Sequence, residues 1–320
     1  MGQPNRASVH MDKPLTDFTV GYLQSSDGFI AEKVVPTLPV AKQTDRYFKF
    51  DPATFARSDM QKRVAGERSN GTGFSVSSDS YSCEKYAVNM PIDYDTLANA
   101  DDQVQLEQNA AIFLAQQALI KKEALFAAAA WKTGVWSSDV LGSGTYKWDD
   151  YTNSDPIRVI DQGKKSVRQK ALMTPNLLVL GEDVFLALKE HPDFVTRLQY
   201  TDPSILTEQK IASMLGVEQV IVATAIQDSA NEGLTASLGN IVSAKSALLL
   251  YKPKSLGMMT PASIVNFAWT GAQHLPRPNG VITRRFEDEA VQARIIETEM
   301  TCAMKITGAD LGVFYSAIVN

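Results

Sequence analysis

The side chains in this sequence that could ligate a metal or act as a general base are scattered along the chain. Its three histidines, His10, His191 and His274, lie far apart, and none has another His or a Cys at the spacing that metal sites use. We expect each of them at the surface or at a helix end. The sequence therefore predicts no metal site.

The cysteines and the clustered glycines add no clear chemistry. Cys83 and Cys302 are the only cysteines, and a cysteine nucleophile needs a positioned base that cannot be named here. Reduced thiols, buried as small apolar side chains, are expected instead. Gly66, Gly71 and Gly73 lack the strand–turn–helix context of a phosphate-binding loop. We therefore expect no catalytic residue and no cofactor, and the sequence favours a protein that is not an enzyme.

Length and composition limit the class of protein further. With 320 residues the chain exceeds a typical single core, so two or more modules are expected. The net charge is −5, and the sequence shows no obvious basic stripe of the kind that duplex-binding proteins carry. No apolar run approaches the ~18 residues that span a bilayer, and the polar N-terminus lacks a signal-peptide core. We expect an unsecreted protein that makes no membrane contact and at most a loose contact with nucleic acid.

A long helix is predicted from Asn99 to Trp136, and the other elements must be arranged around it. Asn99, Asp101 and Asp102 suit a helix N-terminus, and the sequence from Val104 to Trp131 contains neither Gly nor Pro. An apolar face is expected along Val104, Ala111, Leu114, Ala118 and Leu125, widened by Leu106, Ala110 and Phe113, with Lys122 and Glu123 on other faces. Gly134 is the expected stop.

Two segments before this helix lack a core of their own. In Phe29–Val40 two prolines favour an extended path, and the apolar residues need a surface to lie on. Residues 43–95 predict a long β-hairpin whose turn region is dense in both signs of charge. An isolated hairpin of this kind is not stable. The hairpin is therefore either disordered or completed by another subunit, and its charged stretch could also be a solvated loop. We favour contacts with another subunit through Arg57, Asp59, Lys62, Arg63, Glu67 and Arg68.

The second half of the chain predicts an α/β module followed by long strands. Helices are expected over 157–172, 182–190 and 204–215, and strands over 176–181, 219–223 and 247–251. The alternation of apolar residues after Val291 shifts phase by one residue, which predicts a β-bulge. Leu311–Val319 is expected as an apolar tail.

This order of segments resembles the major capsid protein of tailed bacteriophages, the Hong Kong 97-type shell fold, an α+β class. The resemblance covers almost the whole chain and rests on four segments: FIAEKVVPTLPV, YAVNMPIDYDTLANADD, QVQLEQNAAIFLAQQALIKKEALFAAAAWKTGVW and NLLVLGEDVFLALKEHPDF. It implies five parts: an N-terminal arm (1–42), an extended E-loop hairpin (43–92), a peripheral domain with the long spine helix (93–152), an axial α/β domain (153–253), and peripheral strands with a C-terminal tail (254–320).

The resemblance implies a structural function. Copies of the chain would form pentamers and hexamers of an icosahedral head around double-stranded DNA, assembled in the host cytoplasm and retained in the virion. The E-loop and the arm, including Phe29 and Ile30, would contact neighbouring subunits. Scaffolding and portal proteins, and in some cases decoration or cement proteins, would be separate partners, because the arm before Phe29 is short. Covalent cross-linking through Lys62 is less expected than non-covalent contact, because no acceptor can be identified.

Two other functions stay open at this point. An encapsulin-like compartment shell would share the fold but hold protein cargo. A cytosolic α/β enzyme with a disordered insertion would be a monomer or a dimer.

Overall fold

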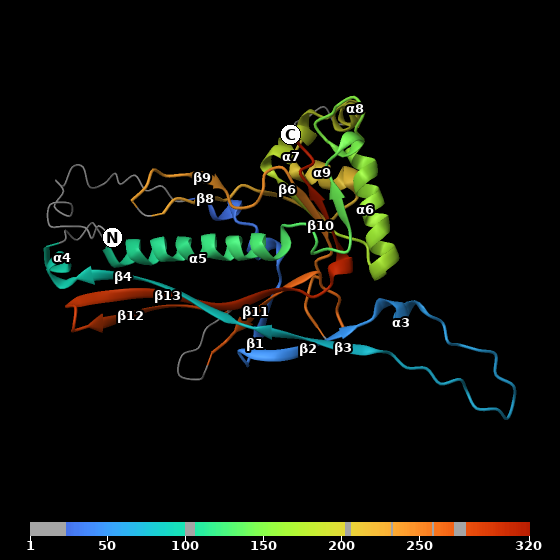
Figure 1. Ribbon diagram of the computed structural model, residues 1–320, viewed down its shortest axis with the longest axis horizontal. Helices are drawn as coiled ribbons and strands as arrows, with labels where there is room; N and C mark the ends of the chain where they lie inside the picture. The colour runs from blue at the N-terminus through green and yellow to red at the C-terminus, as the bar shows by residue number, and fades with distance from the viewer. Residues whose placement is uncertain (1–23, 100–105, 202–205, 232, 258, 272–279) are drawn as a thin grey trace.

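The computed structural model describes residues 24–99, 106–201, 206–231, 233–257, 259–271 and 280–320. Figure 1 shows an elongated lower layer, a more compact upper module, and a hairpin that extends from the lower layer. Two five-stranded sheets account for most of the strands, and they are built from segments far apart in the sequence. The predicted arm before residue 24 lies outside the described residues.

The lower layer is a long sheet with strand order β1-β11-β13-β12, with β4 also paired to β13. Its strands are β1 (Thr37–Val40), β4 (Glu84–Asp93), β11 (Ile264–Trp269), β12 (Val281–Asp288) and β13 (Ala293–Ile306). The predicted β-bulge is wrong, because β13 pairs with all three neighbours in unbroken register. The phase shift has another cause: Ile295 and Ile296 point to opposite faces of the sheet, and both are buried.

The spine helix α5 (Leu106–Ala130) lies along this sheet (Figure 1). It is shorter than predicted. Tyr94–Asn99 forms a separate helix, α4, and residues 100–105 lie outside the described part. At the other end the helix stops before Gly134, because the indole N–H of Trp136 donates to the free carbonyl of Ala130 at 2.8 Å. Gly134 follows in the turn with φ +78°.

The buried face of α5 also differs from the predicted one. Of the predicted positions that the structure describes, Ala110 and Leu114 are buried, and Phe126 and Ala130 join them. Glu123, expected on another face, is buried as well. The helix is rich in alanine and apolar on several sides, so its sequence did not indicate which side meets the sheets.

The upper module is a central sheet with strand order β5-β14-β10-β6-β7. Its strands are β5 (Asp139–Leu141), β14 (Gly312–Ser316), β10 (Ala247–Leu250), β6 (Leu177–Gly181) and β7 (Gln219–Ala223). The helices of the module are α6 (Pro156–Ala171), α7 (Glu182–Glu190), α8 (Pro192–Thr201) and α9 (Glu208–Leu215). The α/β prediction is confirmed for α6, β6, α7, β7 and β10. The expected apolar tail is instead the strand β14, between β5 and β10.

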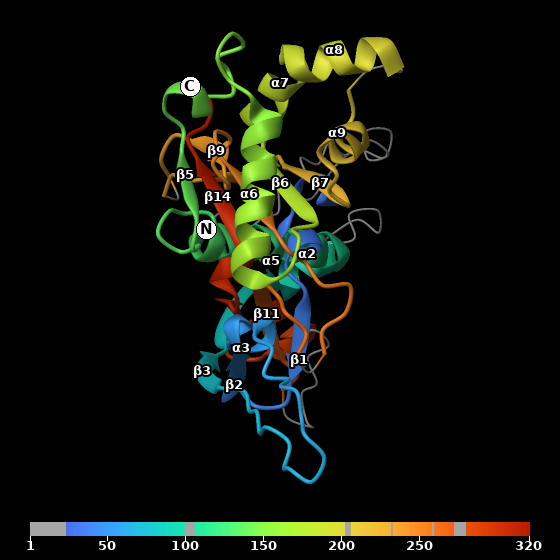
Figure 2. The same ribbon diagram turned by 90° about the vertical axis from the view of Figure 1, so that its right-hand side faces the viewer.

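The two faces of the central sheet carry different helices. On β6, Leu178 and Leu180 belong to a core with α6 and α9, whereas Leu177 and Val179 belong to a core with α5 and α2 (Ala31–Val34). Successive residues of a strand point to opposite faces. Thus α6 and α2 lie on opposite sides of the module, as Figure 2 also shows.

Short elements complete the architecture. They are the hairpin β2 (Thr44–Phe50) and β3 (Val76–Ser82), the helix α3 (Pro52–Ala56) inside it, a second hairpin β8 (Ile226–Asp228) and β9 (Leu238–Asn240), and the 3-10 turns η1 (Ser26–Gly28), η2 (Gly144–Tyr146) and η4 (Ala309–Leu311). Among the described residues, no helix has both the length and the apolar character that a membrane crossing requires.

Candidate functional site

The hairpin β2–β3 is the region that the sequence singled out for contacts with a partner. Its two strands pair in register from Thr44↔Ser82 to Phe50↔Val76. The observed hairpin is shorter than the predicted one, because the chain after Ser82 continues as β4 and pairs with β13. In Figure 1 the loop between the strands extends well beyond the rest of the molecule.

The base of this hairpin is fixed to the long sheet. The ring of Tyr81 stacks on Phe267 with 4.4 Å between centroids, and the Tyr47 ring lies 5.3 Å from the same residue. Asp79 accepts hydrogen bonds from Lys49 and Tyr47, both at 3.0 Å. The Lys49 ammonium, the Ser80 amide and the Tyr47 hydroxyl lower the pKa of Asp79 to about 2. The base is therefore held by aromatic packing and by an ionised carboxylate.

The distal loop has no comparable support. Phe50 contacts the rings of Phe55 and Phe74 at 6.2 and 5.8 Å, yet Phe55 and Phe74 remain more than half exposed. Met60 is 94% exposed and Val64 is 60% exposed. Large apolar side chains that meet only water are unfavourable, and such surfaces mark sites that another molecule covers.

The structure brings some of the predicted charged residues together in this loop. Arg57 pairs with Asp59 at 2.9 Å, and Asp59 also accepts a 2.6 Å hydrogen bond from Thr72. The Thr72 hydroxyl, and then the Arg57 guanidinium, hold the pKa of Asp59 below its usual value. Asp59 thus ties the two limbs of the loop together.

The remaining predicted residues of the loop are exposed. Arg63 donates to the backbone carbonyl of Glu67 at 2.7 Å. Within the described part of the chain, Lys62 and Arg68 have no ion pair or hydrogen bond from their side chains, so both are available to a partner.

The structure contradicts the prediction that Phe29 and Ile30 contact a neighbour. Phe29 is 4% exposed and Ile30 is fully buried, both within their own subunit. The expected extended path is also wrong at this point, because Ala31–Val34 forms the short helix α2, which ends before Pro36. Only after that does the chain extend, as β1 beside β11.

A buried carboxylate explains why this segment stays on its own subunit. The Glu123 side chain is fully buried, and its Oε2 accepts the amide hydrogens of Ile30 at 3.0 Å and Ala31 at 2.8 Å. These amides are free donors at the N-terminus of α2. Burial raises the pKa of Glu123 to about 7, although the two amide bonds act in the opposite direction. The sequence analysis missed this residue.

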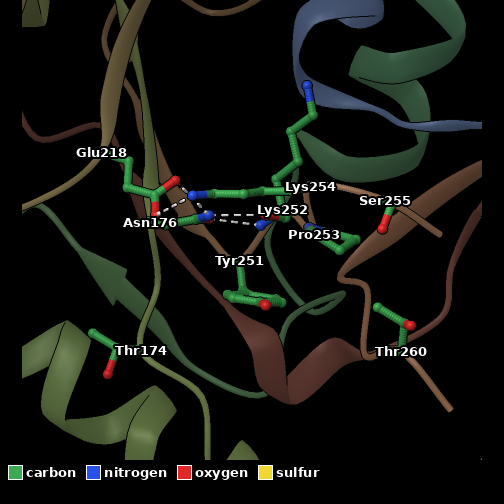
Figure 3. A pocket seen from close by; sticks show the side chains of 9 residues that line it. All are labelled: Thr174, Asn176, Glu218, Tyr251, Lys252, Pro253, Lys254, Ser255 and Thr260. Carbon is green, nitrogen blue, oxygen red and sulfur yellow. Dashed lines mark hydrogen bonds and ion pairs between the residues drawn. The ribbon is translucent and has the colours of Figure 1, made fainter. Parts of the chain in front are cut away.

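The other end of α2 is held by a lysine. The ammonium of Lys252 donates to the carbonyl of Lys33 in the last turn of α2, and burial lowers the pKa of this lysine. In Figure 3 its side chain points away from the adjoining shallow pocket toward α2. The pocket floor is structural: the Asn176 amide binds both backbone groups of Lys252 at 2.8 Å, and Glu218 pairs with Lys254. The contacts made by Asn176 and Lys252 at this pocket therefore connect β6 and β10 to α2.

Ser154, His191 and Asp193 resemble a catalytic triad, but their hydrogen bonds cap the start of a helix instead. His191 is buried, its Nε2 lies 3.0 Å from Ser154 Oγ, and its Nδ1 accepts the amide hydrogen of Asp193 at the start of α8. Ser154 already donates its proton to the Asp150 carbonyl, so Nε2 must carry the shared proton. The histidine therefore cannot take a proton from Ser154. The expected capping role is confirmed for His191, while His10 and His274 lie outside the described residues.

Neither cysteine is prepared for nucleophilic chemistry. Both Cys83 and Cys302 are buried free thiols, as expected. Burial raises the pKa of Cys83, and it raises that of Cys302 to about 11. Over the described residues, no cluster of acidic, His and Cys side chains is suited to hold a metal ion.

Comparison with solved structures defines the class of fold. A phage-related protein from Bordetella bronchiseptica RB50 superposes with a TM-score of 0.71 at 18% identity, covering 92% of this chain and 94% of that one. The mature capsid protein of bacteriophage PhiM1 gives 0.59 at 11% identity, with 96% and 92% covered. An encapsulin from Synechococcus elongatus PCC 7942 gives 0.52 at 11% identity, with 100% and 97% covered. The chain has the Hong Kong 97-type shell fold, of the α+β class that was predicted.

Sequence comparison points to one branch of that fold. The major capsid protein of Burkholderia phage BcepMu is 25% identical over 324 residues, with 99% of each chain covered. The major capsid protein of Pseudomonas phage JBD67 is 26% identical over 243 residues, with 73% of this chain and 75% of that one covered. No protein-family model matches the chain. These two relatives confirm the resemblance to major capsid proteins of tailed phages.

Proposed function

We propose that the protein is the major capsid protein of a tailed bacteriophage and acts by assembly rather than by catalysis. Two curated relatives with that name, one covered over nearly its full length, support this function over an encapsulin shell or an enzyme. The capsid neighbours support self-association into pentamers and hexamers of a virion head. The hydrogen bonds of the Ser154–His191 cluster and the protonated cysteine thiols agree with a structural role.

The observation that carries the proposal is the contrast within the hairpin β2–β3. Its base is bound to the subunit by Tyr81, Phe267 and Asp79, while its distal loop exposes apolar and charged side chains without a core. We assign this loop as the E-loop and propose that Arg57, Asp59 and their charged neighbours up to Arg68 lie against the next subunit. Many such contacts, each weak, stabilise a closed shell together.

The family names for the other parts are proposed on the same basis. The long sheet with α5 corresponds to a peripheral domain, and the central sheet with α6–α9 corresponds to an axial domain. Because β5 and β14 lie in the central sheet, the axial domain also includes residues 139–141 and 312–316. Scaffolding and portal proteins, decoration proteins and loosely held double-stranded DNA are the proposed partners, and the host cytoplasm is the proposed place of assembly.

Removal of the distal loop tests the proposal. Replacing Arg57–Gly73 by a short Gly-Ser turn should leave the thermal unfolding of the subunit unchanged, because this stretch contributes no buried core. It should abolish the megadalton particles that the unmodified chain forms, as seen by size exclusion and negative-stain imaging. A second variant keeps the full length of the loop but has its six charged residues changed to Ser. It separates the effect of the charges from the effect of the loop's length.

Two outcomes would count against the proposal. An unmodified chain that stays a monomer or a dimer under all assembly conditions would favour the enzyme alternative. Native particles that protect protein cargo but no nuclease-resistant DNA would favour the compartment shell.

A further inference from the structure

The strand β12 is a free edge of the long sheet. It comes last in the strand order, and Figure 1 shows it on the far side of β13 from β4. Its eight residues pair only with β13, and over the described residues no backbone hydrogen bond joins β12 to any other element. The N–H and C=O groups along its outer side are therefore free to pair with another strand.

This edge has little of the protection that natural proteins give to free strands. Prolines, bulges, a short length or charged side chains usually prevent edge-to-edge pairing. β12 is eight residues long, contains no proline and has no bulge. Its charged side chains are the remaining protection, and they prevent pairing only where like charges would lie opposite each other.

The charged part of β12 is complementary to itself when it is read in the opposite direction. Two antiparallel copies centred on Phe286 place Arg285 opposite Glu287, and Arg284 opposite Asp288. Opposite charges directly across an antiparallel pair stabilise it. Centring the pair on Arg285 or on Glu287 instead would put each of these residues opposite its own copy. The charges therefore permit one register and disfavour its neighbours.

The side-chain positions agree with this register. Arg284 and Phe286 share one face of the sheet, with the guanidinium 5.5 Å from the ring centre, and Phe286 is 39% exposed. Arg285 lies on the other face, where it pairs with Glu107 of α5 at 2.9 Å. Opposite residues in this register are an even number of positions apart, so they share a face. The sheet would thus continue from one copy to the next with both α5 helices on the same side.

These charges also have partners within their own subunit. Arg284 pairs with Glu297 at 3.0 Å, and Glu287 pairs with Arg294 at 3.1 Å. The side chains of Arg285 and Glu287 nevertheless stay 62% and 58% exposed. The charge pairs between two copies would therefore select the register rather than supply most of the binding energy. That energy would come from the backbone hydrogen bonds and from burial of the two aromatic rings.

We propose that β12 pairs with β12 of a second copy of this chain, antiparallel and centred on Phe286, so that two long sheets join edge to edge about a two-fold axis. A second copy is favoured over an unrelated strand because the charges of β12 complement themselves. The contact does not depend on the proposed capsid function, since two copies can pair in this way without a shell. In a shell it would add a symmetric contact to that of the E-loop.

Disulfide trapping in the full chain tests the register. Directly opposite residues have Cα atoms about 4.5–5.5 Å apart, within reach of a disulfide. F286C should therefore give a dimer band on a non-reducing gel after mild oxidation with copper phenanthroline. The native cysteines are both buried and should not contribute. The matched control is T283C, also exposed on β12, whose two copies would lie roughly 20 Å apart and should give no dimer band.

Charge exchange in the F286C background tests the complementarity. R285E and E287R each place like charges opposite each other, so each variant alone should lose the dimer band. An equimolar mixture of the two should recover it, because every charge then meets its opposite. K305E is the control: it changes the charge of an exposed residue of β13 beyond the part that pairs with β12, and it should keep the band. Circular dichroism confirms that each variant folds.

The outcomes separate this contact from the proposed function. If F286C gives no dimer, or cross-links no better than T283C, the contact is wrong, and the capsid function stands wherever the unmodified chain forms particles. A mixture of the charge variants that fails to recover the band would overturn the register. Cross-linked dimers from an unmodified background that forms no particles would leave the contact standing while the proposed function fails.

Discussion

Two segments of the N-terminal third lack a core when their sequence is considered alone, yet the structure treats them differently. Phe29–Val35 is buried between α5 and the central sheet, with Glu123 and Lys252 binding the two ends of α2. The loop from Arg57 to Gly73 contains no buried residue, and only Asp59 is partly covered. The apolar side chains of the first segment are buried within the subunit, whereas the loop leaves both its charged side chains and apolar ones such as Met60 and Val64 exposed.

The largest expected effect comes from placing a charge in the buried segment. Ile30→Asp should destabilise the subunit by at least about 3 kcal/mol, because an unpaired carboxylate would lie where no part of Ile30 meets water. Thermal unfolding of the monomer measures this loss. The matched control is Phe55→Asp in the loop, which should change stability by less than about 0.5 kcal/mol. Equal losses at both sites would remove the distinction between the segments.

Next in size is the pH dependence caused by Glu123. Its pKa is about 7 in the folded chain, against an ordinary value of 4.5 for glutamate, so the folded state binds the proton more tightly. Stability from this group is therefore fully present below about pH 4.5 and is lost as the pH rises through about 7, by up to about 3 kcal/mol.

The comparison variant for this residue is Glu123→Gln. Its amide oxygen can still accept from Ile30 and Ala31, but it cannot ionise. Denaturant unfolding between pH 5 and 8 should show a falling stability for the unmodified chain and a flatter curve for the variant. Parallel curves would mean that Glu123 does not titrate in this range.

A smaller effect is expected at the other end of α2. Lys252→Met keeps most of the side-chain volume but removes the hydrogen bond to the Lys33 carbonyl, which should cost about 1 kcal/mol. Hydrogen exchange at the amides of Lys33–Val35 should accelerate in this variant. Lys254→Met is the control, since that side chain is 85% exposed and does not contact α2.

The smallest effect is expected in the loop. Lys62→Arg should change neither stability nor assembly, because the lysine has no partner within the described part of the subunit and non-covalent contact is expected there. Boiled particles of the unmodified chain should run as monomers on a denaturing gel. A ladder of bands that disappears in the variant would instead reveal a covalent cross-link at Lys62.

The sequence was sufficient for α6, β6, α7, β7 and β10 of the α/β module, because these strands are continuous apolar runs and the helices have clear ends, such as Asp155 capping α6. It did not place β5 or β14 in the central sheet. It was not sufficient where burial depends on long-range packing. Glu123 looks like a surface residue in a helix, and only the position of α2 makes it a buried acceptor. The predicted bulge in β13 failed for the same reason, because sheet faces covered by different segments imitate a shift in register.

For the candidate site, composition singled out the charged loop, and the structure shows that this loop is exposed. The charges from Arg57 to Arg68 stand out because both signs occur in a short stretch. Phe29 and Ile30 were assigned outward because nothing in the sequence places the central sheet beside them.

The position of β14 has a consequence for how the chain matures during translation. This strand contains residues 312–316 but occupies an inner place between β5 and β10. Proteins are synthesised from the N-terminus, so the central sheet stays split until these residues have left the ribosome. A prematurely terminated chain would lack that inner strand and could not present a finished surface to its neighbours. We therefore expect incomplete chains to be excluded from assembly.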